Sequence, residues 1–212
     1  VKAKIIRCLE PLRHAELGAN KNNMFAFSSG TATVVNQGFQ YHSMERLGIA
    51  QYLSRDGQLL DGNSTDSLPA AKEFWMTDPV WQGLRRYIEN LLCVEDWFEV
   101  FIAQDVVLDT LVYDLIYRQF DESITEQGGS DLAMLIEFMQ EWHKDNSRWV
   151  DATLKTTVAE SDHNRELIAA WVGEWKEKAV ADLAPLAEIA VGENAVDEAV
   201  AVLDKRLAKA GL

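Results

Sequence analysis

Residues 95–120 read EDWFEVFIAQDVVLDTLVYDLIYRQF, and this stretch decides the fold class. A set of residues recurs along it at steps of three and four: Phe98, Ile102, Val106, Asp109 and Tyr113. Positions three and four apart share one face of an α-helix, so the stretch predicts a single long helix with one buried side. Asp109 stands among apolar neighbours on that face, which makes it a candidate for chemistry.

The same helical periodicity extends over the rest of the chain. It predicts long helices over residues 9–27, 31–54 and 131–158, and further helices rich in Ala and Glu after a break at residues 159–164. The four prolines fall near predicted helix starts or in connections. We therefore expect an all-α protein, a single helical bundle over residues 1–212 with extra C-terminal helices.

Local signals place the connections between these helices. In the segment TDPVW, Asp78 is suited to cap a short helix that begins at Pro79, where the missing N–H costs nothing. Residues 55–69 are polar and contain glycine, which predicts a loop. Residues 126–131 predict a second break, with Ser130 capping the helix that follows.

Composition narrows the class of protein. A chain of 212 residues with 48% hydrophobic residues and seven Trp can bury one large core. The formal charge of −14 excludes a nucleic-acid partner, and no apolar run reaches the ~18–20 residues that cross a membrane. Cys8 and Cys93 fit neither a disulfide framework nor a zinc spacing, so we expect reduced thiols and a cytoplasmic protein.

Several acids fall at the spacing of a di-metal site. Helical bundles can hold such a centre with one carboxylate on each of two helices and a Glu-x-x-His pair on each of the other two. Residues three apart share a helix face and can bind one ion. In this frame the predicted helices offer Glu16, Glu45 with Gly48, Asp109, and Asn146 with Trp149.

The ligand set of this frame is incomplete. Gly48 has no ligand atom, Trp149 would fill the cavity, and an amide stands at Asn146. Two divalent ions need about four carboxylates and nitrogen ligands, so we expect no metal here. Spacing alone leaves a plainer interpretation open, in which the acids are surface residues or satisfied buried pairs. Any buried acid needs an Arg or Lys, a hydrogen bond from Asn146, or a turn toward solvent.

Other polar pairs in the sequence have simple structural explanations. Three pairs stand at helical or near-helical spacing: His42 with Glu45, Glu10 with His14, and Glu141 with His143. Hydrogen bonds inside a bundle and surface ion pairs account for such pairs more simply than metal ligation does. No Ser-His-Asp set, Cys-His pair or phosphate-binding glycine loop occurs in its needed context. We therefore predict no catalytic and no cofactor-binding residue.

Five strings in order along the chain resemble one family. They are HAELGANKNN (14–23), YHSMERLGIAQYLSRDG (41–57), WQGLRRYIE (81–89), DWFEVFIAQDVVLD (96–109) and MQEWHKDNSRWVDA (139–152). Together they resemble the β subunit of bacterial multicomponent (soluble di-iron) monooxygenase hydroxylases, most closely that of the multicomponent phenol hydroxylases. In that comparison DNSRW is similar to a DExRH-type segment of the catalytic subunit, with Asn146 and Trp149 in place of Glu and His.

The resemblance implies a fold, an activity and partners. The fold is ferritin-like and similar to ribonucleotide reductase, and this chain is a non-catalytic structural subunit without a cofactor of its own. The di-iron centre belongs to a partner α subunit, in an (αβγ)2 hydroxylase that contains a second copy of this chain. Effector and reductase components complete an NAD(P)H- and O2-dependent aromatic monooxygenase. Family β subunits are longer, so we expect an N-terminal region of the family to be absent here.

Two functions from different classes remain open at this point. The chain is either the structural β subunit of a phenol- or toluene-type hydroxylase, or an autonomous ferritin-like di-metal enzyme or binding protein with an atypical site. The first predicts a large apolar surface for the catalytic subunit, with aromatic residues of the first three long helices at its centre. The second predicts metal bound by the chain alone.

Overall fold

The computed structural model describes the backbone of residues 1–127 and 130–212, and the side chains of these ranges except those of residues 130–135. Every regular element in these ranges is a helix and none is a strand, which confirms the all-α prediction. None of the helices described combines the length and the apolar character that crossing a membrane demands.

The helices follow one another with short connections. Their bounds are α1 Lys2–Cys8, α2 Leu12–Ser29, α3 Thr33–Leu60, α4 Ser67–Thr77, α5 Pro79–Leu91, α6 Trp97–Phe101, η1 Ile102–Leu108, α7 Asp109–Val112, η2 Tyr113–Phe120, α8 Asp121–Glu126, α9 Ser130–Glu160, α10 Asp162–Ala190 and α11 Ala195–Ala210. The elements η1 and η2 are π-helical stretches.

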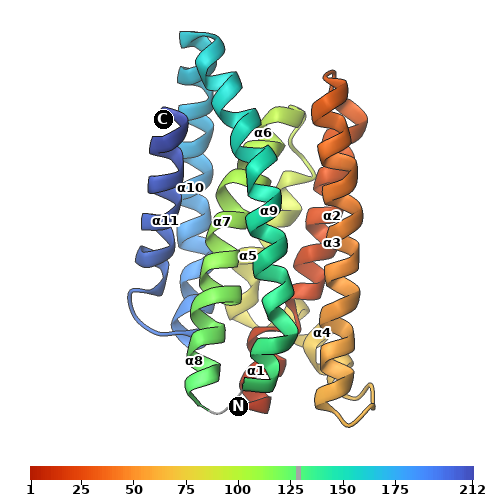
Figure 1. Cartoon of the computed structure of the whole chain (residues 1–212). Coiled ribbons are helices and arrows are strands. Elements are labelled where there is room, and N and C mark those ends of the chain that lie inside the picture. Colours follow the sequence, from red (N-terminus) through yellow and green to blue (C-terminus); the bar gives the residue numbers. More distant parts are fainter. Residues whose placement is uncertain (128–129) are drawn as a thin grey trace.

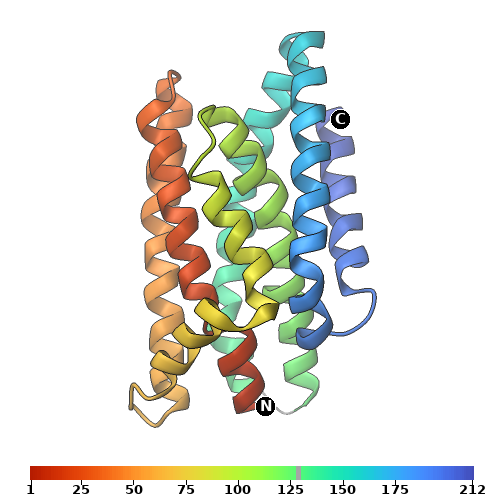
Figure 2. The same ribbon diagram turned by 180° about the vertical axis from the view of Figure 1, so that it is seen from behind.

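The long helices run side by side along one axis (Figure 1). The pair α2 and α3 forms one edge of the bundle, and α10 with α11 forms the opposite edge. The helix from α6 to α8 runs through the middle with α9 in front of it, while α5 lies behind, between α2 and α10 (Figure 2). This arrangement surrounds the middle helix with neighbours.

The middle helix is the one predicted from residues 95–120. Asp96 caps it, because its Oδ1 accepts a hydrogen bond from the Phe98 amide at 2.8 Å, and the helix continues through η1, α7 and η2 to Glu126. Every side chain from Val100 to Tyr117 is buried, so the prediction of one buried side was too narrow. A π-helical stretch carries an additional residue in its turn and often occurs at functional sites.

Most helix positions agree with the sequence prediction. Asp78 caps α5 as predicted, accepting a hydrogen bond from the Val80 amide at 3.2 Å. Helix α9 covers the predicted span, and Ser161 caps α10 through a hydrogen bond from Asn164 N to its Oγ at 3.1 Å. In the predicted break at residues 126–131, Gly128 and Gly129 lie outside the described residues, and so does the Ser130 side chain at the start of α9.

Two boundaries were predicted wrongly. The first predicted helix, 9–27, begins at Leu12 and ends at Ser29 as α2, with Pro11 at its N-cap, and a separate helix, α1, that was not predicted precedes it. The predicted loop at residues 55–69 is helical at both ends, in the last turns of α3 and the first turn of α4. The polar residues of this segment indicated a loop, but Asp56 is only 2% exposed and belongs to a buried part of α3.

Candidate functional site

A buried ion pair occupies the interior between α2, α3 and the middle helix. Arg46 on α3 is 2% exposed and donates from Nη1 to Glu16 Oε2 on α2 at 2.8 Å. Its Nη2 donates to Asp109 Oδ2 at the start of α7. The guanidinium therefore lies between two carboxylates that the sequence had placed in a metal-site frame.

Further donors complete the hydrogen bonds of both carboxylates. Glu16 Oε1 accepts from the hydroxyls of Tyr113 at 3.3 Å and Tyr117 at 3.0 Å. The Gln104 amide donates to Asp109 Oδ1 at 2.9 Å, and its own oxygen accepts from Asn22 at 2.9 Å. Buried carboxylates require such partners, so the expectation that Arg and other donors satisfy these acids is confirmed.

Aromatic rings enclose the Arg46 guanidinium. Its carbon lies 4.8 Å from the centre of the Trp142 ring and 5.3 Å from that of Tyr113, as in cation–π contacts. Burial acts to lower the pKa of Arg46, but the surrounding groups, with Tyr113 and Glu16 foremost, outweigh it and raise that pKa above its ordinary value. Arg46 is a permanent cation at this place.

A second polar group lies beside the ion pair. His42 Nδ1 lies 4.0 Å from Asp105 Oδ1, and His42 Nε2 lies 3.8 Å from Asp109 Oδ2. The His42 side chain is buried, with 2% of the residue exposed. Neither nitrogen has a hydrogen-bond partner in the part of the chain that the structure describes. Burial, followed by the charge of Arg46, lowers the pKa of His42 well below its ordinary value, so the ring is neutral.

The residues around His42 resemble a metal-ligand set in composition but do not fit a di-iron centre. Ligand atoms of His42, Asp105 and Asp109 all lie within 4.8 Å of one another, which suffices geometrically for one ion. However, the same Asp109 oxygen accepts from Arg46, and Asp105 Oδ1 accepts from the Asn23 amide at 3.0 Å. A second cation would meet the guanidinium at close range. Burial nonetheless raises the pKa of Asp105 to about 6, against the effect of Arg46.

The other predicted positions form a separate group between α3 and α9. Glu45 is exposed, and its Oε2 accepts from Trp142 Nε1 at 2.7 Å and from the Asn146 amide at 3.3 Å. Trp149 Nε1 donates to Asn146 Oδ1 at 3.1 Å. Gly48 lies on the outer side of α3, and no atom lies within 4 Å of where its Cβ would be. The six predicted positions therefore fall into three places. Glu16 and Asp109 lie together in the interior. Glu45, Asn146 and Trp149 are linked at the edge between α3 and α9, and Gly48 lies on the outer side of α3.

Comparison with known proteins shows the family of this chain. Residues 1–161 match the family described as Methane/Phenol/Alkene Hydroxylase. The chain belongs to this hydroxylase family. It is 51% identical over its whole length to the phenol 2-monooxygenase oxygenase component DmpL of Pseudomonas sp. (strain CF600) and 46% identical to MhpL of Acinetobacter pittii (strain PHEA-2). It spans 64% of the length of each of these relatives.

Solved structures extend the comparison. A chain of phenol hydroxylase from Pseudomonas sp. OX1 superposes with a TM-score of 0.96 at 43% identity, covering 99% of this chain and 64% of that one. A toluene 4-monooxygenase (T4moH) chain has a TM-score of 0.74 at 22% identity, covering 95% and 63%, which shows the fold. The resemblance to the phenol hydroxylase family, drawn from five sequence strings, is confirmed.

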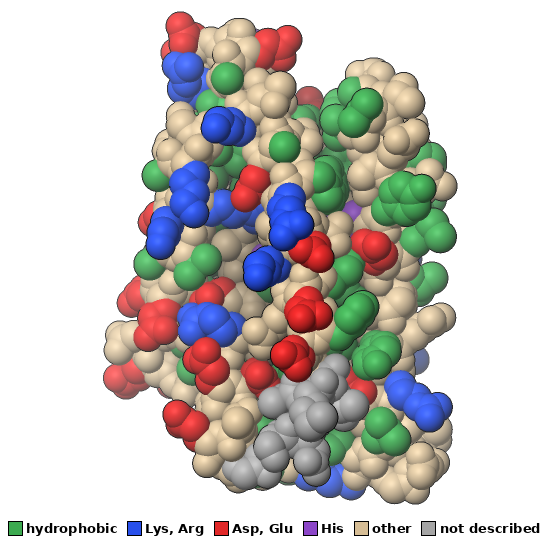
Figure 3. All heavy atoms as spheres, viewed as in Figure 1, with side chains coloured by type: hydrophobic (Ala, Val, Ile, Leu, Met, Phe, Trp, Pro, Cys, Tyr) green, Lys and Arg blue, Asp and Glu red, His purple; other side chains and the backbone are tan. Residues whose placement is uncertain are grey.

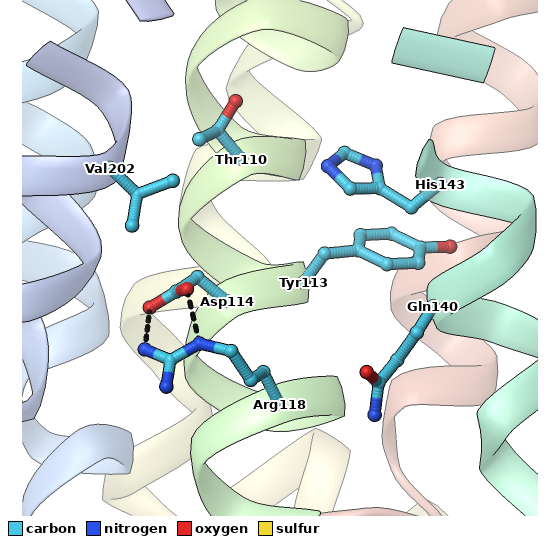
Figure 4. Close-up of a pocket in the computed structure, with 7 residues that line it drawn as sticks. All are labelled: Thr110, Tyr113, Asp114, Arg118, Gln140, His143 and Val202. Atoms are coloured by element: carbon cyan, nitrogen blue, oxygen red, sulfur yellow. Dashed lines mark hydrogen bonds and ion pairs between the residues drawn. The ribbon is translucent and has the colours of Figure 1, made fainter. Parts of the chain in front are cut away.

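The chain also has a surface hollow next to Tyr113, one of the residues that hold Glu16. Figure 4 shows the residues that line it, which come from the middle helix, α9 and α11. Its volume is about 170 Å³. Its lining consists of Thr110, Tyr113, Asp114, Arg118, Gln140, His143 and Val202. The His143 ring stacks on Tyr113 with centroids 4.3 Å apart, and burial lowers the pKa of His143 to about 3. This hollow is small, and the Asp114 carboxylate and the Arg118 guanidinium on its wall neutralise each other through bonds of 2.7 and 2.9 Å.

The residues that dominate the site were not predicted from the sequence. Each contacts or neighbours a predicted acid, and they are Arg46, Asp105, Tyr113, Tyr117 and Trp142. A signal for Arg46 was present, because Phe39, Ile49 and Leu53 mark the inner face of α3 and Arg46 falls on that face. Glu45, the adjacent residue, does not.

Proposed function

We propose that the chain is a non-catalytic structural β subunit of an aromatic monooxygenase hydroxylase of the phenol or toluene type. The observation that carries this proposal is the Arg46 guanidinium bound to Glu16 and Asp109. A fixed cation takes the place in which a di-metal centre would need free carboxylates. The chain offers substrate and oxygen no open coordination position there, so the oxidising chemistry belongs to another subunit.

The relatives support the type of complex. DmpL and MhpL are oxygenase components of phenol 2-monooxygenase, and a 105-residue segment is 29% identical to the hydroxylase component subunit beta of a toluene-4-monooxygenase system. We infer that a partner α subunit holds the di-iron centre, in an (αβγ)2 assembly with this chain present twice, served by effector and reductase components. The two free cysteines are consistent with the cytoplasm.

An exposed apolar face supports a large interface. Hydrophobic side chains gather along α3 and the adjoining edge of α9 (Figure 3). Six exposed hydrophobic residues of α3 and α9, given with their exposed fractions, are Val34 (82%), Tyr41 (64%), Met44 (62%), Tyr52 (47%), Leu59 (43%) and Phe138 (52%). Monomeric proteins rarely leave so many large apolar side chains together on one surface. We place the contact with the catalytic subunit on this α3 face.

The His42 group favours one rival function. If an ion displaced the Arg46–Asp109 contact, then His42, Asp105 and Asp109 could hold it, and the chain would be a metal-binding protein in its own right. Metal analysis separates the two proposals. The structural-subunit proposal predicts iron in the co-purified complex and none bound stoichiometrically by this chain after the partner is removed.

The decisive experiment is co-expression with a candidate catalytic subunit that carries two Glu-x-x-His motifs. We expect the two chains to co-purify, with iron content following the partner and hydroxylation requiring both chains. A monodisperse chain that binds iron alone, beside a partner that hydroxylates fully without it, would refute the proposal.

A further inference from the structure

Two further carboxylates are buried near the end of α3, where Glu10 lies against Gly57, the residue that follows Asp56. Glu10 lies in the turn between α1 and α2, and Asp56 lies near the end of α3. Their exposed fractions are 1% and 2%. None of their four oxygens accepts a hydrogen bond from the described residues, and the Ser67 hydroxyl, which lies close enough to Glu10 to lower its pKa, donates to the Gly57 carbonyl instead. Leaving buried carboxylates without a partner is costly, so this cluster needs a positive charge that the protein chain does not supply.

The backbone is shaped to hold the Glu10 carboxylate. A Cβ on Gly57 would lie 2.9 Å from Glu10 Cδ and 3.0 Å from each of its oxygens, so a larger residue there would have to displace the end of the Glu10 side chain. Glycine at position 57 lets this carboxylate lie directly against α3. Two neutral oxygens occur at the same end of α3, where the Ser67 hydroxyl donates to the Gly57 carbonyl oxygen at 3.5 Å.

The charged residues nearby are engaged elsewhere. Lys2 pairs with Asp61 at 2.8 Å, and Arg13 donates to the Leu68 carbonyl at 2.6 Å. Burial raises the pKa of Asp56 to about 7, and the charge of Glu10 adds to this rise. Burial also raises the pKa of Glu10. The Ser67 hydroxyl opposes this rise, Asp61 adds to it, and Arg13 and Lys2 reduce it. These cations do not neutralise the pair.

We propose that Glu10 and Asp56 bind a hard divalent cation of the Ca2+ or Mg2+ class. A single shared proton would join one oxygen of each carboxylate and leave two oxygens and one net charge without a partner. A divalent cation can take all four oxygens and cancels both charges. Both side chains offer only oxygen ligands, and a set made only of oxygens selects hard cations.

A bound cation would have a structural consequence. Asp56 borders a hollow of about 580 Å³ on α3, together with Gly48, Gln51, Tyr52, Arg55 and Leu59. An ion held by Glu10 and Asp56 would tie the α1–α2 turn to the end of α3. The site is separate from the Arg46 centre, so its failure or success does not decide the proposed function.

The test uses the full chain, purified with any partner subunits that accompany it. After EDTA treatment and dialysis, CaCl2 or MgCl2 is added separately, and the melting temperature and bound metal per chain are measured. We expect one additional equivalent of bound metal and a melting temperature raised by roughly 5–10 °C when the cation is about 100-fold above its Kd. Asp56→Asn and Glu10→Gln should lose both effects, whereas the exposed controls Asp66→Asn and Glu73→Gln should keep them.

A further variant keeps both charges and changes only the space. Gly57→Ala should push the Glu10 carboxylate aside and abolish cation binding, while Gly173→Ala, where no atom lies within 4 Å of the new Cβ, should not. If the wild-type protein binds neither cation and its melting temperature is unchanged by both, the cation site is refuted. Direct metal analysis of the wild type gives this answer even where a variant fails to fold.

The pH dependence separates a cation from a shared proton. With the pKa of Asp56 raised to about 7, the pair without metal contributes most stability at acidic pH and loses it as pH rises through about 7. With cation bound, protons compete for the carboxylates, and the dependence on pH takes the opposite sign. Unchanged pH dependence in saturating CaCl2 and MgCl2 would show that the pair holds a proton and no metal.

Discussion

Arg46 on α3 and Asp109 at the start of α7 are joined by a direct ion pair in the interior of the bundle, 63 residues apart in sequence. Asp109 is the acid that the sequence marked out among apolar neighbours, and Arg46 is the cation that it requires. The exposed fractions of the two side chains are 2% and 4%. Because neither reaches solvent, each depends on the other for its charge to be tolerated.

Removing the cation should be strongly destabilising. Arg46→Met leaves Glu16 and Asp109 without their ion-pair partner, and breaking a buried pair costs about 3–5 kcal/mol. Chemical denaturation measures the free energy of unfolding. The matched control Arg148→Met, whose side chain is 75% exposed, should change it by less than about 0.5 kcal/mol. Equal effects of the two substitutions would contradict the role given to Arg46.

The same cation should also keep metal out. In Arg46→Ala the Asp109 oxygen is released beside His42 and Asp105, whose ligand atoms already lie within 4.8 Å of one another. We expect this variant to bind one equivalent of Co2+, with visible absorption bands, and the wild type to bind none at this site. The double variant Arg46→Ala/His42→Ala should lose the bands. Co2+ bands of equal intensity in the wild type would show that Arg46 does not exclude metal.

The sequence allowed prediction of the elements better than of the site. The heptad-like spacing from Phe98 to Tyr113 was enough to identify the middle helix, and the Asp78–Pro79 pair was enough to place the start of α5. Local rules of this kind depend on residues close in the chain. The end of α3 was predicted too early, because Asp56 has the polarity of a loop residue and the sequence does not show that it is buried.

The site was predicted only in part because its partners are distant in sequence. Glu16 and Asp109 were two of the candidates and both bind Arg46 in the structure, but nothing local in the sequence indicates that Arg46 joins them. Glu45 attracted attention through its spacing from Gly48, although the inner face of α3 carries His42 and Arg46. A one-residue error on a helix turns the side chain by about 100°, which separates interior from edge.

The two tyrosines that hold Glu16 should contribute separately. Tyr117→Phe removes a hydroxyl that donates to Glu16 at 3.0 Å inside the core. Loss of a hydrogen bond to a charged group costs about 1.5–3 kcal/mol, and thermal or chemical unfolding should show it. Tyr41→Phe is the control, since Tyr41 is 64% exposed. If Tyr117→Phe were as neutral as the control, Glu16 would have to find its donors elsewhere.

Acid should destabilise the protein in part through His143. Burial lowers the pKa of His143 to about 3, whereas an unfolded His titrates near 6.5. The unfolded state therefore binds the proton more readily, so the stability from neutral His143 is fully present above about pH 6.5 and is lost as pH falls toward 3. His143→Gln should reduce the slope of stability against pH in that window. The exposed His163, changed to Gln, should leave the slope intact.

The α3 face gives the last test, because it predicts what happens to the assembly. Tyr41 and Met44 are 64% and 62% exposed and lie on one side of α3, so a charge at either would be buried unpaired against a catalytic subunit. Met44→Glu should leave the melting temperature of this chain nearly unchanged. It should nonetheless dissociate the complex and remove hydroxylation together, as seen by size-exclusion chromatography and turnover.

A matched substitution controls for the added charge itself. Leu167→Glu places the same carboxylate on α10, at a leucine that is 39% exposed and far from the α3 face. It should leave both assembly and turnover intact. If Leu167→Glu dissociates the complex while Met44→Glu does not, the catalytic subunit docks on the α10 side, and the apolar residues of α3 must serve another contact, such as the second copy of this chain.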